Sequence, residues 1–231
     1  MGSEWPSITI GVLTLNREWI IGEMLGSLLA QDYPRERVHV LIVDAGSQDR
    51  TVELAEELLK KARVSYEIVI KKCNIPEGRN ICLEKARARG DVLVFWDSDV
   101  LALDGRVLKS LLEPIVRGEA DIVAPRVRRV VVRGPEELRS LLRRPRLPRR
   151  RNARRMAAAS MSLTAISRRV VGSGLEFDPD LTWYEDFDFS VKAREKGFRL
   201  MRLWGIEVLD VNLRREAYSS IYVSMPFGEY V

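Results

Sequence analysis

Two aspartates, Asp97 and Asp99, stand one residue apart directly after the apolar run "VLVFW". Side chains at i and i+2 of an extended segment point to the same side, so the two carboxylates converge while Ser98 faces away. Two carboxylates this close repel each other, and one protonates unless a cation lies between them. Oxygen ligands suit hard divalent ions, so the pair predicts a Mg²⁺ or Mn²⁺ site. A solvated turn capped by an aspartate is the alternative.

The first hundred residues alternate between strand-like and helix-like segments. The apolar, β-branched segments that we expect to be strands are 7–15, 38–44, 66–70 and 91–96. The segments with helical spacing of apolar residues are 17–31, 51–62 and 76–90. This alternation predicts an α/β fold, a mostly parallel doubly wound sheet with helices on both faces. Ligands bind beyond the carboxyl ends of such strands, where Asp44, Asp97 and Asp99 fall.

The second half of the chain is less regular. We expect helices at 105–118, 135–144 and 185–197, and one or two strands in each of 120–132 and 198–211. No repeat or linker is visible, so we expect one domain over 1–231, with a nucleotide-binding half (1–104), an acceptor half (105–211) and a tail (212–231). Two prolines and a dense charge run predict a mobile loop at 145–155.

Charge and cysteine content narrow the class of protein. Residues 126–155 hold thirteen Arg and two Glu, a net +11, so the other residues carry −6 of the chain's +5. Such a local patch does not predict a general nucleic-acid binder. The two cysteines form no C-x-x-C motif, which fits a reducing compartment. Without a signal peptide or a spanning apolar run, we expect a cytoplasmic protein, with peripheral contact at the cytoplasmic face of the membrane left open.

Five short motifs occur in order along the chain. They are "TLNR" (14–17), "VDAGSQDRT" (43–51), "GRN" (78–80), "WDSDV" (96–100) and "WYEDFDFSVKAREKGFR" (183–199). A P-loop and a framed G-x-G-x-x-G are both missing, which argues against P-loop NTPases and classical dinucleotide-dependent dehydrogenases. The order and spacing of the motifs resemble the inverting glycosyltransferases of family two, which have the GT-A fold, over roughly residues 8–211.

The resemblance implies a role for each matching residue. Asp97 and Asp99 match the D-x-D that holds the metal on the donor diphosphate. Asp186 matches the catalytic base, with Glu185 beside it. The residues assigned to the nucleotide sugar are Thr14, Asn16, Asp44, Arg79, Asp97 and Ser98. Alternatives are a turn for Asp44, a helix cap for Asn16, a solvated cation for Arg79 and a favourable helix N-terminus for the two acids at 185–186.

Two positions depart from the family pattern or extend it. Ala45 stands where a second acid is usual, which loosens any inference about the base recognised. Asp210 falls where many relatives place a histidine near the metal, so we assign it as a third ligand, against an ordinary strand-end aspartate. Trp183 and Tyr184, just before the proposed base, are candidates for stacking on an acceptor sugar, or for simple packing.

Together these features predict a metal-dependent, inverting transfer of a sugar from a nucleoside-diphosphate sugar to an acceptor hydroxyl or a lipid-linked phosphate. We expect UDP first, with GDP and TDP open, and Mn²⁺ or Mg²⁺ as cofactor. The loop 145–155 would hold anionic headgroups or a phosphate acceptor, or be solvated. Two alternatives are a non-enzymatic module that binds nucleic acid or an anionic membrane through 126–155, and a nucleotidyltransferase on a related fold.

Overall fold

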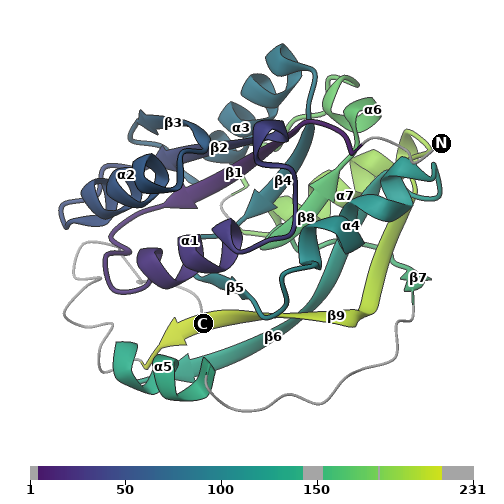
Figure 1. Cartoon of the computed structure of the whole chain (residues 1–231). Helices are drawn as coiled ribbons and strands as arrows, with labels where there is room; N and C mark the ends of the chain where they lie inside the picture. Colours follow the sequence, from purple (N-terminus) through teal and green to yellow (C-terminus); the bar gives the residue numbers. More distant parts are fainter. Residues whose placement is uncertain (1–4, 143–152, 182, 215–231) are drawn as a thin grey trace, which may run out of the picture.

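The computed structural model describes residues 5–142, 153–181 and 183–214 (Figure 1). The loop predicted at 145–155 therefore lies largely outside the described residues, and so does the tail from residue 215. Ala153–Arg155, which we expected within that loop, instead form the short strand β7, paired antiparallel with the long strand β9. That pairing joins segments about fifty residues apart, which a charge run cannot reveal.

Four parallel strands form one side of the sheet, in the spatial order β3-β2-β1-β4. They are β1 (Ile8–Thr14), β2 (Val38–Asp44), β3 (Ser65–Ile70) and β4 (Val92–Trp96). The helices between them are α1 (Ile21–Leu29), α2 (Thr51–Ala62) and α3 (Ile75–Arg89), with a 3-10 turn at Arg35–Arg37. The predicted alternation is confirmed, and the carboxyl ends of β1, β2 and β4 meet at one edge (Figure 1).

The other side of the sheet mixes directions. Its strands are β5 (Val100–Ala102), β6 (Ile122–Val132), β8 (Leu163–Ile166) and β9 (Leu200–Leu213). Strand β8 is antiparallel to both β4 and β6, whereas β6 and β9 are parallel. The helices here are α4 (Val107–Val116), α5 (Pro135–Leu142), α6 (Arg168–Val171) and α7 (Glu185–Glu195). The register of β6 on β9 jumps at Pro125/Arg126, from Leu203 to Glu207, so β9 bulges there.

Two apolar clusters show that helices cover both faces of the sheet. Along β4, Val92, Val94 and Trp96 belong to one cluster, and Leu93 and Phe95 belong to the other. This division follows from the alternation of side chains along a strand. Helices α1 and α4 pack on the first face, while α3 and α7 pack on the second. The β4 run is buried on both faces, and its aspartates come where that burial ends.

The helix expected at 17–31 is shorter than predicted, because it begins only at Ile21. Residues 15–20 instead form a loop in which Asn16 takes a left-handed φ of 51°. The helix expected at 76–90 is confirmed almost to the residue. Asn74 and Glu77 form a capping box at its start, and Gly90 ends it in the left-handed conformation.

Candidate active site

The aspartate pair lies in the tight turn that joins β4 to β5. The Asp97 amide donates to the Ser162 carbonyl (2.8 Å), and the Asp99 carbonyl accepts from the Val211 amide (2.9 Å). These backbone bonds fix the turn between β8 and β9. The two carboxylates remain 29% and 24% exposed, whereas Ser98 between them is buried. Both acids follow β4 directly, as predicted, but they lie in a turn rather than in the extended segment from which their convergence was inferred.

An arginine from a different element approaches each aspartate. Arg79 of α3 lies 4.0 Å from Asp97 and 2.9 Å from Glu185, and its side chain is 6% exposed. Its guanidinium also lies over the rings of Phe95 and Phe177. Arg79 is therefore a buried bridge between β4 and α7, and the alternative of a solvated helix cation is wrong. Arg17, to which we assigned no role from its motif, lies 3.5 Å from Asp99.

The carboxylates in this turn are short of positive charge. Burial raises the pKa of Asp97 to about 7, and the nearby Asp99, Asp210 and Glu185 add to that rise, while Arg79 opposes it. Burial also raises the pKa of Asp99, with Arg17 opposing and Asp210 contributing. Both shifts favour the protonated acid, first because burial disfavours the charged form and second because the neighbouring carboxylates repel.

This donor set fits a divalent cation. Two carboxylates in one turn offer hard oxygen ligands, and a cation near them would offset the repulsion that adds to the effect of burial on their pKa values. No group of three or more His, Cys, Asp or Glu side chains within residues 5–142, 153–181 and 183–214 is arranged to hold an ion. An ion here would take ligands from the pair and complete its shell with further oxygen ligands, as Mg²⁺ does on substrate phosphates.

Asp210, assigned by resemblance as a third ligand, lies on β9 directly opposite Val100. Its charge reaches both aspartates of the turn, as their pKa shifts show. In this structure its own oxygens contact other partners, the Arg129 guanidinium at 3.3 Å and the Asn212 amide at 2.6 Å. Its role as a ligand stays a prediction.

The loops after β1 and β2 are tied to each other by side chains. The Asp44 carboxylate accepts from the amides of Gly46 (3.0 Å) and Ser47 (2.8 Å) and from the Ser47 hydroxyl (2.5 Å). The Asn16 side-chain oxygen accepts from the Gln48 amide (2.8 Å), and the Ser47 hydroxyl accepts from the Asn16 amide (2.8 Å). Asp44 therefore stabilises the turn after β2, which was the alternative to nucleotide binding. Asn16 binds the loop after β2 and does not cap the helix that follows it in the sequence.

Thr14, the last residue of β1, has a buried hydroxyl oxygen without a hydrogen-bond partner. A buried hydroxyl normally finds a partner, and one that lacks it is common where a ligand supplies the bond. The Thr14 hydroxyl at the end of β1 is therefore available to a ligand.

Helix α7 carries the predicted catalytic acids. Glu185 is buried and bound to Arg79, whereas Asp186 is partly exposed and lies in the first turn. The Ser190 hydroxyl accepts from the Ala159 amide (3.0 Å), which fixes the helix to the segment that also holds the Asp97 amide. Trp183 and Tyr184 are 60% and 78% exposed, and Tyr184 takes a left-handed φ of 65°. The two acids thus face different surroundings, one inside and one towards solvent.

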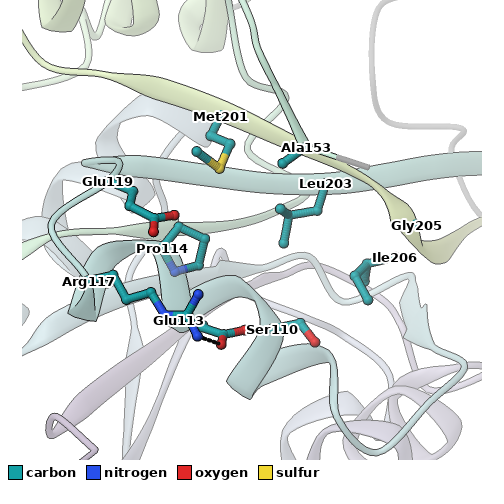
Figure 2. Close-up of a pocket in the computed structure, with 10 residues that line it drawn as sticks. All are labelled: Ser110, Glu113, Pro114, Arg117, Glu119, Ala153, Met201, Leu203, Gly205 and Ile206. Carbon is teal, nitrogen blue, oxygen red and sulfur yellow. Dashed lines mark ion pairs between the residues drawn. The ribbon is translucent and has the colours of Figure 1, made fainter. Parts of the chain in front are cut away.

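A separate hollow of about 180 Å³ lies between α4, β7 and β9 (Figure 2). Met201 and Leu203 of β9 form one wall, and Pro114 of α4 forms the other. Its charged side chains include Glu113 and Arg117, which pair with each other at 2.6 Å. None of the acids discussed above lines it, so we place the candidate site at the β4–β5 turn.

The arginines between residues 126 and 142 already have carboxylate partners. Arg128 and Arg129 lie 3.0 Å and 3.3 Å from Glu207 and Asp210. The remaining pairs are Arg126–Glu207, Arg133–Glu137 and Arg139–Glu23. This neutralisation weakens the alternative of a module that binds polyanions through 126–155, as far as residues 126–142 are concerned.

Comparison with known proteins agrees with this geometry. The family model of glycosyl transferase family 2 matches residues 9–170, more than half of the chain. The chain belongs to glycosyltransferase family 2. The match contains four of the five motifs and both aspartates of the turn, and it ends before α7.

Two relatives show how this family-2 chain compares in sequence. A poly(ribitol-phosphate) β-N-acetylglucosaminyltransferase, TarS, of Staphylococcus aureus is 30% identical over 124 residues, 53% of this chain and 21% of that protein. A β-monoglucosyldiacylglycerol synthase of Synechocystis is 29% identical over 114 residues, 48% of this chain and 22% of that protein. The matched segments therefore span about a fifth of these relatives' own length.

Solved structures show the fold. S. aureus TarS residues 1–349 with UDP-GlcNAc superposes with a TM-score of 0.70 at 22% identity, over 94% of this chain and 62% of that one. A mannosyltransferase of Pyrobaculum calidifontis in complex with GDP-Man and Mn²⁺ gives 0.67 at 19% identity, over 90% and 57%. The predicted GT-A fold is confirmed. No helix within the described part of this chain is long and apolar enough to span a membrane.

Proposed function

We propose that this chain is the catalytic domain of a metal-dependent, inverting glycosyltransferase that uses a UDP-sugar. The observation that carries the proposal is the under-neutralised pair Asp97 and Asp99, held at the carboxyl edge of β4 beside the loops of β1 and β2. Such a pair fits a ligand that brings positive charge on one side and phosphate on the other. A metal-bound nucleoside diphosphate has that character.

In this proposal the residues around the β4–β5 turn stabilise the leaving group. Transfer breaks the bond between the anomeric carbon and the diphosphate, so negative charge grows on the departing oxygen. A Mn²⁺ or Mg²⁺ held by Asp97 and Asp99 would supply the positive charge that stabilises this leaving group. Arg79 lies 4.0 Å from Asp97 and adds a fixed cation without reorganisation. Asp210, whose charge reaches the same turn, is the proposed further ligand.

Asp186 is the proposed general base. It is the partly exposed acid of α7, so an acceptor hydroxyl can reach it and give up a proton as the oxygen attacks the anomeric carbon. Attack from the face opposite the diphosphate inverts the configuration in one step, and no covalent nucleophile is needed. The exposed rings of Trp183 and Tyr184 precede this acid and would contact the acceptor.

Glu185 has a different task in this proposal. Its carboxylate is buried and bound to Arg79 at 2.9 Å, so it positions the guanidinium between β4 and α7. We assign it to positioning and leave proton transfer to Asp186. The pair Arg79–Glu185 then joins the donor side of the site to the helix that carries the base.

The donor and acceptor are inferred from different sources. The similar structure of TarS contains UDP-GlcNAc, which supports UDP. The similar mannosyltransferase contains GDP-Man, so the experiment below must also compare UDP with GDP. Thr14, Asn16, Asp44 and Ser98 would line the nucleotide side. The acceptor is a hydroxyl or a lipid-linked phosphate.

A comparison of two acids in the same helix tests the proposal. With Mn²⁺ present, UDP-sugars should be hydrolysed slowly, and Asp186→Asn should lower the turnover about 10²- to 10⁴-fold while UDP binding stays unchanged. Asp188→Asn is the matched control, because Asp188 is also in the first turn of α7 but pairs with Lys192 at 2.6 Å. Equal turnover in wild type and Asp186→Asn would refute the base assignment. Absence of any nucleotide-sugar binding would refute the function.

A further inference from the structure

Asn80 follows Arg79 in the motif "GRN", and its side chain ties α3 to the segment that precedes α7. Its Nδ2 donates to the Phe177 carbonyl and its Oδ1 accepts from the Phe177 amide, both at 2.8 Å. One side-chain amide thus satisfies both backbone groups of a residue 97 positions away. The main chain at Phe177 is therefore fixed to α3, because any shift would break both bonds.

The ring of Phe177 carries this tie into α7. It stacks on the ring of Phe189, with the centroids 4.2 Å apart and the planes 10° from parallel. The two side chains are 1% and 0% exposed, and Phe189 lies one turn of α7 after Asp186, the proposed base. Because buried side chains are closely packed, a displacement of Phe177 would be passed to the first turns of α7.

The same turn of α3 makes a second tie to α7. Arg79, next to Asn80 in the chain, binds Glu185 at 2.9 Å, and Glu185 is the first residue of α7. The segment before the helix is thus held at both of its ends by consecutive residues of α3. Since Arg79 also lies 4.0 Å from Asp97, one helix contacts both the proposed metal ligands and the element that carries the base.

We propose that Asn80 is a positioning residue, which by holding Phe177 fixes the distance of Asp186 from the β4–β5 turn. This inference rests on the proposed function. A general base must lie within hydrogen-bond reach of the hydroxyl that it deprotonates. A misplacement of about 1 Å costs up to about 100-fold in rate. The polar groups of the Asn80 side chain are bound to Phe177, so its loss should lower turnover and leave donor binding intact.

The test compares turnover with donor binding. At saturating Mn²⁺, kcat is measured with the UDP-sugar that the wild type hydrolyses fastest, and UDP binding is measured by calorimetry. Asn80→Ala should lower kcat about 10- to 100-fold and leave the Kd of UDP within about twofold. Thr9→Val is the matched control, because it removes a buried hydrogen bond to Asp91 (2.8 Å) near the amino end of β1, away from the site. It should lower the melting temperature and leave kcat unchanged.

A double variant separates positioning of the base from general support of the fold. If Asn80 acts through Asp186, adding Asn80→Ala to Asp186→Asn should lower kcat by less than about twofold further, because residues that act as a unit are not additive. A general structural role would instead multiply the two losses. The stability of each protein is followed by thermal melting.

Asn80→Asp keeps the shape of the side chain and decides the matter should Asn80→Ala fail to fold. Its carboxylate accepts from the Phe177 amide but repels the Phe177 carbonyl, so kcat should fall about tenfold. A folded Asn80 variant with wild-type kcat would overturn the proposal, and so would fully additive losses with Asp186→Asn. UDP affinity that falls as far as kcat would place the effect of Asn80 on the donor and overturn it as well. A wild type with neither UDP binding nor turnover would refute the proposed function instead.

Discussion

Two clusters of polar side chains lie at the same edge of the sheet, and their carboxylates are compensated to different extents. At the ends of β1 and β2, Asp44 accepts three hydrogen bonds from Gly46 and Ser47, and Asn16 accepts one from Gln48. At the end of β4, Asp97 and Asp99 have loose arginine partners and raised pKa values. The oxygens of Asp44 and Asn16 are hydrogen-bonded within the protein, whereas the charges of Asp97 and Asp99 are not fully compensated there.

This difference distinguishes a structural cluster at the ends of β1 and β2, here called the β1–β2 frame (Asp44 and Asn16 with their partners), from the proposed reacting centre at the end of β4. Saturated hydrogen bonds fix the loops that would flank the nucleotide, because each buried acceptor is costly to leave open. Incompletely compensated carboxylates cost stability and are retained where a ligand completes them. We therefore expect substitutions in the β1–β2 cluster to lower stability, and substitutions in the β4 turn to lower ligand binding.

Asp99→Asn should give the largest effect, a loss of Mn²⁺-dependent UDP binding of more than about 100-fold. Asparagine removes the charge of one of two ion ligands, and the loss of one charge partner in a site of this kind costs several kcal/mol. Calorimetry with and without a chelator measures it. The control is Asp104→Asn in the loop after β5, whose carboxylate is 54% exposed. Wild-type UDP binding that survives chelation would contradict the role of the pair.

Asp44→Ala should lower the free energy of unfolding by about 2 kcal/mol, because it leaves two loop amides and a hydroxyl without their acceptor. Urea unfolding measures the change. Asp32→Ala is the control, since Asp32 is 67% exposed and its pair with Lys109 is worth less than about 1 kcal/mol. Equal losses in both variants would show that Asp44 does not hold the frame.

The parts that were predictable are those whose signals are local. The apolar runs of β1, β2 and β4 and the cap, Pro and Gly of α3 lie within single segments, so the parallel half follows from the sequence. Strands β5 and β7 have three residues each and pair with β9 over long separations, so no local pattern marks them.

The same distinction holds within the site. The i, i+2 spacing of Asp97 and Asp99 indicated their convergence. Arg79 pairs with Glu185, 106 residues away, and Arg17 pairs with Asp99. Such pairs depend on the packing of α3 on α7 and of the β1 loop on the β4 turn, which spacing alone does not encode. For that reason Arg17 received no role from the sequence.

A change of pH should also distinguish the two clusters. Because the pKa of Asp97 is about 7 beside Asp99, Asp210, Glu185 and Arg79, protons compete with Mn²⁺ below that value. We expect Mn²⁺ affinity to fall by up to about tenfold per pH unit as the pH drops below 7, and to level off above 8. Paramagnetic resonance titrations between pH 5.5 and pH 8.5 check this. A flat profile would show that Asp97 is ionised throughout.

The smallest effect should have the opposite sign to that of Asp44→Ala. In the metal-free protein, Asp97→Asn should raise the free energy of unfolding by about 1 kcal/mol at pH 8, because it removes a carboxylate that the fold disfavours. The pKa of Asp97 in the folded protein lies above its ordinary value. The destabilisation of the wild type by the ionised Asp97 therefore decreases as the pH falls through 7 and disappears near pH 4. The gain from asparagine should shrink over the same range. Thermal unfolding of both proteins at pH 4, 6 and 8 measures it, and a destabilised Asp97→Asn at pH 8 would mean that the β4 turn is as complete as the β1–β2 frame.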